Sequence, residues 1–103
     1  MLDGCVASMQ VLPEIVDAVA PKVTVMVDGG FRRGADILKA IAAGASSVFV
    51  GRATLFGLAA GGQAGVARAL SILRGEMDRA IALIGCRKLT ELGRQHLAMS
   101  LQR

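Results

Sequence analysis

Aromatic side chains are scarce in this sequence, which has no tryptophan, no tyrosine and three phenylalanines among its 103 residues. Sites for single-stranded nucleic acids depend on aromatic rings on which the bases stack. The basic residues, which give the chain a formal net charge of +4, are scattered along it rather than gathered into one stripe. We therefore predict that the chain has no nucleic-acid partner.

Cysteine and histidine are also rare, with two cysteines and one histidine. Cys5 and Cys86 lie far apart and form no C-x-x-C pattern, so they indicate neither a disulfide framework nor a metal site. His96 stands in a polar segment, and a single histidine without a partner residue indicates no role. We predict no metal ligand in this chain.

Long hydrophobic runs are missing as well. No segment reaches the roughly 18 consecutive apolar residues that a membrane-spanning helix requires. The first residues, Met1 to Gly4, lack the basic region followed by an apolar stretch that begins a signal peptide. We therefore expect a cytoplasmic protein, and the length of 103 residues is enough for one small domain.

The predicted elements follow the order helix, strand, helix, strand, helix. Apolar residues recur at helical spacing after Ser8, which we expect to cap the first helix. In the last helix an apolar stripe would face the core, and charged residues such as Glu76 would face solvent. The other predicted elements are strands at 23–27 and 47–50, helices at 35–43 and 54–60, and a helix from Gln63 to Ile84 after a break at Gly61-Gly62.

Both predicted strands, Val23–Val27 and Ser47–Val50, are nearly continuous apolar runs, which is typical of strands buried on both faces of a parallel sheet. Two such strands need neighbours on both edges. The fold class is therefore predicted as α/β, as part of a larger parallel assembly, and a (β/α)₈ barrel fits best. Alone, the chain is expected to self-associate through its open sheet edges.

Glycines and arginines follow each predicted strand, as Asp28-Gly29-Gly30-Phe31-Arg32-Arg33-Gly34 and as Gly51-Arg52. Glycines let a ligand approach the backbone and leave N–H groups pointing at it. Arginines donate paired hydrogen bonds to phosphate oxygens. Barrels often build a phosphate site from the loops after the last two strands and the N-terminus of a short extra helix. The sequence therefore favours a phosphate-bearing ligand.

Four motifs occur in order: DGGFRRGADILKA at 28–40, VFVGRATLFGLAA at 48–60, GQAGV at 62–66 and IGCRKLTEL at 84–92. At this spacing they resemble the FMN-dependent 2-hydroxy-acid dehydrogenases and oxidases, which include glycolate oxidase, L-lactate dehydrogenase and mandelate dehydrogenase. The resemblance implies FMN as the cofactor and a (β/α)₈ barrel as the fold. Residues 1–103 would be the C-terminal quarter of that barrel, with strands seven and eight and their flanking helices.

The resemblance also implies which residues contact the phosphate end of FMN. Asp28 would orient Arg32 or accept a hydrogen bond from a ribityl hydroxyl, because a carboxylate repels phosphate. Arg33 is expected to be structural or solvated. The predicted cofactor-binding residues are Asp28, Gly30, Arg32, Gly51 and Arg52.

In the family, the catalytic histidine and a substrate-binding arginine lie in a His-Gly-x-Arg stretch immediately before a Leu-Asp-Gly segment, which is Leu2-Asp3-Gly4 here. Met1 precedes Leu2, and His96 does not match that motif. Oxidation of a 2-hydroxy acid to a 2-oxo acid needs a base beside the flavin. We therefore predict no catalytic residue, an inactive chain when alone, and 2-hydroxy acid binding only in a full-length parent.

The predicted function is thus the FMN-phosphate-binding part of a 2-hydroxy-acid-oxidising enzyme. Two alternatives remain open at this point. One is an inactive remnant that serves as an oligomeric or binding module. The other is a different phosphate-binding barrel enzyme, such as an IMP dehydrogenase, which carries related glycine-rich strand ends.

Overall fold

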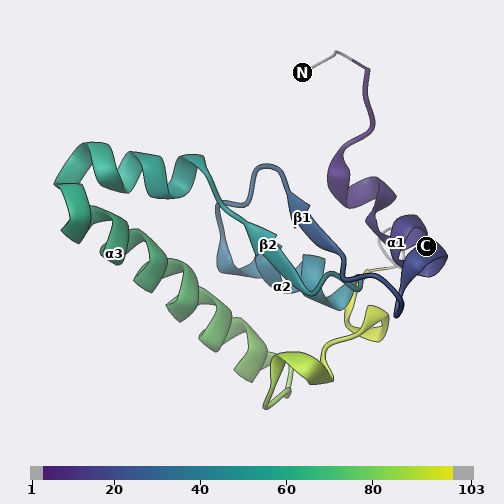
Figure 1. Ribbon diagram of the computed structural model, residues 1–103. Coiled ribbons are helices and arrows are strands. Elements are labelled where there is room, and N and C mark those ends of the chain that lie inside the picture. Colours follow the sequence, from purple (N-terminus) through teal and green to yellow (C-terminus); the bar gives the residue numbers. More distant parts are fainter. Residues whose placement is uncertain (1–3, 99–103) are drawn as a thin grey trace.

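Three helices and a sheet of two parallel strands make up the computed structural model, which describes residues 4–98 (Figure 1). Two short 3₁₀ turns, Leu89–Glu91 and Arg94–His96, follow the last helix. The helix–strand order is the predicted one. The elements are α1 (Ser8–Val19), β1 (Met26–Asp28), α2 (Gly34–Ala42), β2 (Ser47–Phe49) and α3 (Arg52–Leu83).

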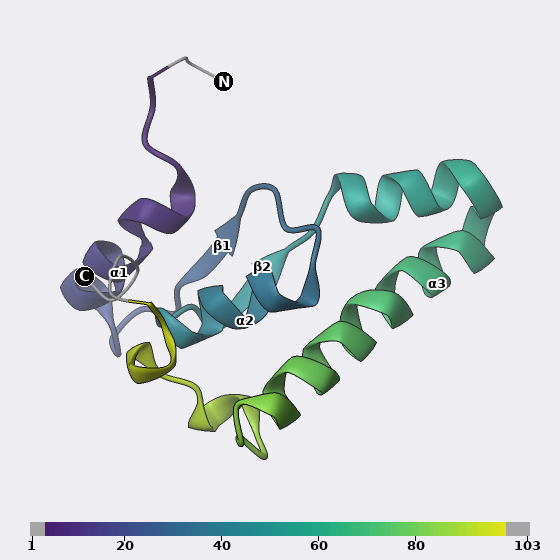
Figure 2. The same cartoon turned by 180° about the vertical axis from the view of Figure 1, so that it is seen from behind.

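The two strands pair in parallel, with Met26 opposite Ser47 and Asp28 opposite Phe49. Val27 lies in the core, whereas Met26 and Phe49 are 54% and 56% exposed. The prediction of strands buried on both faces is therefore wrong. The reason is that α2 packs against one face of the sheet, and no described element covers the other (Figure 2).

The first strand is also shorter and later than the predicted range of 23–27. Ser46 N–H donates to the Val25 carbonyl at 2.8 Å, but residues before Val25 have no partner strand among the described residues. Val23, at the start of the predicted range, is 56% exposed. An apolar run becomes a strand only where a neighbour accepts its backbone hydrogen bonds.

Helix α1 begins differently from the expectation that Ser8 caps it. Ala7 is the N-cap residue, and its N–H donates to the Gln10 side chain at 3.3 Å. Ser8 is the first helical residue, and its hydroxyl donates to the Asp28 carbonyl at 2.9 Å. The serine therefore fastens the start of α1 to the end of β1.

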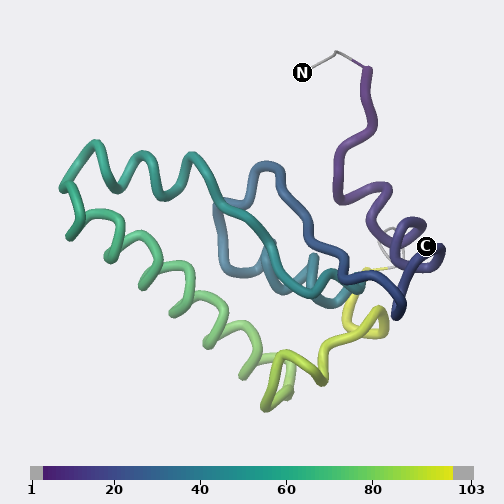
Figure 3. Tube along the Cα trace, in the orientation of Figure 1, coloured from purple at the N-terminus to yellow at the C-terminus, as the bar shows by residue number. Residues whose placement is uncertain are grey.

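Helix α3 folds back on itself at the predicted break. Gly61 and Gly62 have non-helical backbone angles, and Gly62 has a φ of +61°. Residues 52–60 run away from the sheet, and residues 63–83 return beside it as the second arm of a hairpin (Figure 3). The predicted interruption of the helix is thus confirmed, and the second arm packs against α2.

One hydrophobic core joins the three helices to the sheet, with Leu12 of α1, Val27 of β1, Ile37 of α2 and Leu73 of α3 among its buried residues. Arg94 fastens the C-terminal turns to α1, because it donates to Asp17 at 2.8 Å and to the Pro13 carbonyl at 3.1 Å. Over residues 4–98, the helices lack the combination of length and apolar character that a bilayer crossing requires.

Candidate functional site

The loops that follow β1 and β2 lie at the same end of the sheet (Figure 1), because carboxyl ends of parallel strands share one edge. They enclose a hollow of about 300 Å³, which we call the strand-end hollow. This volume is at the lower end of the range for small-molecule sites, about 300–1,000 Å³. Its lining contains all five predicted site residues, Asp28, Gly30, Arg32, Gly51 and Arg52, together with Gly29, Phe31 and Ala53.

The backbone of the first loop depends on two glycines. Gly29 has a φ of +130° and Gly30 a φ of +74°, which are conformations that other residues rarely adopt. A Cβ atom on Gly29 would also lie 2.9 Å from the Ser8 hydroxyl. Phe31, which is buried, ties this loop to the core. The main chain can therefore turn back across the end of β1 without a side chain filling the hollow.

Three arginines near this edge have different surroundings. Arg32 and Arg52 are exposed and line the hollow, and their side chains make no hydrogen bond or ion pair among the described residues. Arg33, by contrast, donates from Nε to both carboxylate oxygens of Glu76 at 3.1 Å and does not line the hollow. The expectation that Arg33 is structural is consistent with this contact.

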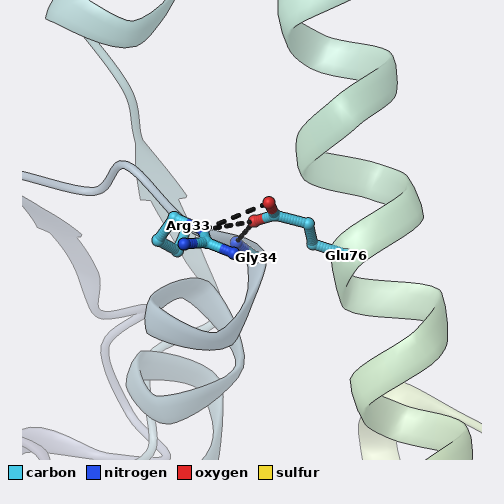
Figure 4. A network of polar contacts seen from close by, with 3 residues as sticks. All are labelled: Arg33, Gly34 and Glu76. Atoms are coloured by element: carbon cyan, nitrogen blue, oxygen red, sulfur yellow. Dashed lines mark hydrogen bonds and ion pairs between the residues drawn. The ribbon is translucent and has the colours of Figure 1, made fainter.

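Glu76 closes the N-terminus of α2, in a group that we call the α2 clamp: Arg33, Gly34 and Glu76 (Figure 4). The Gly34 N–H donates to Glu76 Oε1 at 2.7 Å. This hydrogen bond, and next the one from the Arg33 guanidinium, hold the pKa of Glu76 below its usual value. The side chain of Glu76 is 19% exposed. The prediction that Glu76 faces solvent is therefore wrong, because α2 packs over it.

The strand-end hollow offers similar donors, but none of them is bonded to a carboxylate of the described residues. Helix α3 begins at Arg52, and the first N–H groups of a helix have no acceptor within it. The positive end of the helix dipole adds to the charge of Arg32 and Arg52. Asp28 contributes one opposing charge, and it makes no side-chain hydrogen bond among the residues described. The hollow therefore fits a phosphate group, and its size suits one end of FMN rather than the whole molecule.

His96 lies outside this site. Its Nε2 is 3.5 Å from Cys86 Sγ, and its Nδ1 accepts the Gly93 N–H at 3.2 Å. These contacts hold the second 3₁₀ turn near the end of α3, which is a structural arrangement. Cys5 is exposed and Cys86 is buried, and both are free thiols. Within residues 4–98, no group of three or more histidine, cysteine or carboxylate residues could hold a metal ion.

The family model of the FMN-dependent dehydrogenases matches residues 1–99. The chain belongs to this family. The family's cofactor is FMN, as predicted from the motifs. Membership in this family favours the resemblance to the 2-hydroxy-acid dehydrogenases and oxidases over the alternative of an IMP dehydrogenase-like barrel enzyme.

Similar proteins of this family are much longer than this chain. An L-lactate oxidase from a Nostoc species is 55% identical over 91 residues, which make up 88% of this chain and 25% of the relative. Glycolate oxidase from Spinacia oleracea is 46% identical over 97 residues and is covered over 26% of its length. The chain thus spans about a quarter of the curated relatives that it matches.

The fold agrees with solved structures of the family, which are barrel flavoenzymes. A soluble mutant of the membrane-associated (S)-mandelate dehydrogenase from Pseudomonas putida superposes with a TM-score of 0.89 at 45% identity. The superposition covers 95% of this chain and 28% of that enzyme. The α/β class and the parallel strands are therefore confirmed, and the chain has the backbone shape of one part of such an enzyme.

The sequence pattern did not indicate the roles of two residues at this edge. Ser8 supports the first loop through the Asp28 carbonyl, and Glu76 fixes the loop's far end through Gly34. Both act across a long sequence separation, so no local pattern marks them. Ala53, by contrast, begins the segment 53–60 that was expected to supply the short extra helix of the phosphate site, and it lines the hollow.

Proposed function

We propose that this chain is the FMN-phosphate-binding, C-terminal quarter of a (β/α)₈ barrel enzyme that oxidises 2-hydroxy acids to 2-oxo acids. The observation that carries the proposal is the strand-end hollow. Two arginines there lack any protein partner among the described residues, at the N-terminus of a helix and beside glycine backbone. Family membership supplies the identity of the phosphate-bearing ligand.

Each of the five predicted cofactor-binding residues has a role in this proposal. Arg32 and Arg52 bind the phosphate oxygens, because guanidinium groups donate paired, charge-assisted hydrogen bonds. Gly30 and Gly51 offer backbone N–H groups at short range. Asp28 orients Arg32 or accepts a hydrogen bond from the ribityl chain. When bound, FMN supplies the electron acceptor for oxidation of the substrate.

The chain does not provide the rest of the chemistry by itself in this proposal. His96 is engaged with Cys86 and Gly93 and does not line the hollow, so it is not placed to act as a base there. The 2-hydroxy acid would be bound by the remainder of a full-length enzyme. We therefore expect no oxidation of lactate, glycolate or mandelate by the purified chain, and measurable turnover would overturn that part of the proposal.

The test is the comparison of FMN with riboflavin, which differs from FMN by lacking the phosphate. Quenching of flavin fluorescence on titration with the full chain gives both dissociation constants. We expect FMN to bind at least about tenfold more tightly, because one charge-assisted contact is worth roughly 1.5–3 kcal/mol. Equal affinities would remove the phosphate role from the hollow. No affinity for either flavin would favour the alternative of an inactive remnant.

A further inference from the structure

An apolar groove lies between β2 and the returning arm of α3, on the side of β2 that carries no partner strand in the described part of the chain. It has a volume of about 570 Å³ and a charged rim that includes Arg74 and Asp78. Leu70, on its wall, is 47% exposed. We call this groove and the free edge of β2 the docking surface. Its apolar lining is Ile37, Val48, Val50, Leu70, Leu73, Met77, Ile81 and Leu89.

The uncovered face of the sheet is a second exposed apolar area, separate from the lining of the groove. Met26 and Phe49, on neighbouring strands, are both more than half exposed. Both strands also leave a backbone edge unpaired within residues 4–98. Unpaired strand edges and contiguous apolar patches mark surfaces that bind another polypeptide. The open edge of a parallel pair fits a further parallel strand.

The arrangement of helices decides which polypeptide fits. Helix α1 contacts β1, and α2 packs against both α3 and β2 (Figures 1 and 2). The returning arm of α3 faces β2 across the groove. The chain therefore carries three helices for two strands. A (β/α)₈ barrel has one helix for each strand. If copies of this chain formed a barrel by themselves, α3 of one copy and α1 of the next would both occupy the single helix position between two neighbouring strands.

A six-stranded partner with five helices avoids that conflict, because the two parts together then reach the barrel's eight of each. The length of the relatives points the same way, since about three quarters of each has no counterpart in this chain. The backbone superposes on a 28% share of a solved enzyme with a TM-score of 0.89, so the chain needs no refolding to meet such a partner.

We propose that the docking surface binds the six-stranded remainder of a barrel of the same family, with β2 pairing to the partner's first strand and α3 closing over it. The inference rests on the proposed place of the chain in a barrel and is independent of flavin binding.

The experiment co-expresses the tagged full chain with the portion of the Nostoc L-lactate oxidase that it does not match, in flavin-free buffers. The relative's own matching segment, expressed in the same way, is the positive control. Leu70→Glu places a charge in the groove. Ile72→Glu is its matched control, because Ile72 is 44% exposed against 47% for Leu70 and does not line the groove.

We expect the unaltered chain and Ile72→Glu to co-purify with the partner at equal stoichiometry, and Leu70→Glu to retain at least about tenfold less of it. The proposal is overturned if the relative's own segment is retained and this chain is not, or if both variants are retained alike. It is also overturned if the chain forms a stable homo-oligomer that Leu70→Glu dissolves, because a second copy would then occupy the surface.

A second measurement tests the proposal even if the remainder of the Nostoc enzyme does not fold as a separate polypeptide. The chain replaces the matching segment within the Nostoc enzyme as one polypeptide, and Tm is measured for each variant. We expect Leu70→Glu to lower Tm clearly more than Ile72→Glu does. Equal shifts would mean that the groove is not covered in the joined protein.

Discussion

The N-termini of α2 and α3 lie at the same edge of the sheet and use similar donors, yet only one is closed from within the chain. At α2, the backbone N–H of Gly34 and the Arg33 guanidinium hold the carboxylate of Glu76. At α3, Arg52 and neighbouring Arg32 line a hollow and have no such partner among the described residues. The first end shows what satisfies these donors. The second end therefore fits an anion brought from outside, and the proposed anion is the phosphate of FMN.

The largest expected effect separates the arginines of the two ends. Replacing Arg32 and Arg52 together by alanine should weaken FMN binding at least about hundredfold, because two charge-assisted contacts are lost. Riboflavin affinity should hardly change. Arg33→Ala is the matched control, since Arg33 is bound to Glu76, and should leave FMN affinity within about threefold. A comparable loss with Arg33→Ala would contradict the distinction between the two ends.

The closed end depends on the absence of a side chain at Gly34. A Cβ atom there would lie 2.6 Å from the Met77 backbone nitrogen and 2.8 Å from the Leu73 carbonyl oxygen. Gly34→Ala should therefore destabilise the fold by about 1–3 kcal/mol. Gly75→Ala is the control: its nearest neighbour is the Arg79 side chain at 3.5 Å, and it should stabilise α3 by about 0.5–1 kcal/mol. Thermal unfolding followed by circular dichroism distinguishes the two, and a shift in the same direction would be the contrary result.

A single substitution should make the N-terminus of α3 resemble that of α2, which already has a carboxylate of the chain as its partner. Ala53→Asp places a carboxylate in the hollow and near the N-terminus of α3. We expect FMN affinity to fall about tenfold, because the new carboxylate repels the phosphate and competes for the donors. The same carboxylate should stabilise α3 by about 0.3–1 kcal/mol through its interaction with the helix dipole. Ala53→Asn has the same shape without the charge and should bind FMN more tightly than the aspartate variant. Equal affinities for the two variants would show that no phosphate lies there.

The smallest effect concerns pH. The folded state lowers the pKa of Glu76, so its contribution to stability is present above the unfolded-state pKa and is lost as pH falls through the lower, folded-state value. Glu76→Gln should lower Tm at neutral pH and flatten its decline in acid. Asp78→Asn is the control, because Asp78 is exposed and its side chain has no hydrogen bond or ion pair among the residues described. An unchanged acid profile for Glu76→Gln would remove the proposed role of the α2 clamp.

The open end was predictable from sequence because its determinants are local. A glycine–arginine cluster after each of two apolar runs was enough to bring Arg32 and Arg52 to one edge. The break at Gly61-Gly62 was predictable for the same reason. Family motifs added the identity of the ligand, which the pattern of residues alone left open.

The closed end was not predictable in this way. Glu76 falls on the polar side of a periodic helix, and its contact with Gly34 depends on how two helices pack. The strand limits failed for a similar reason. Val23 has strand-forming character, but it lies before the paired segment. Met26 and Phe49 are exposed, because no described residue covers their face of the sheet. Ser8 was expected to cap its own helix, and it bonds to β1 instead.

The most direct test of the difference between the two helix ends is a titration of the ¹⁵N-labelled chain with FMN, followed through its backbone amide signals. We expect the amide signals of Gly30, Gly51 and Arg52 to shift together and saturate, while that of Gly34 stays in place because Glu76 already accepts its hydrogen bond. Shifts at Gly34 or along the β2–α3 groove, with the strand-end amides unmoved, would contradict this expectation.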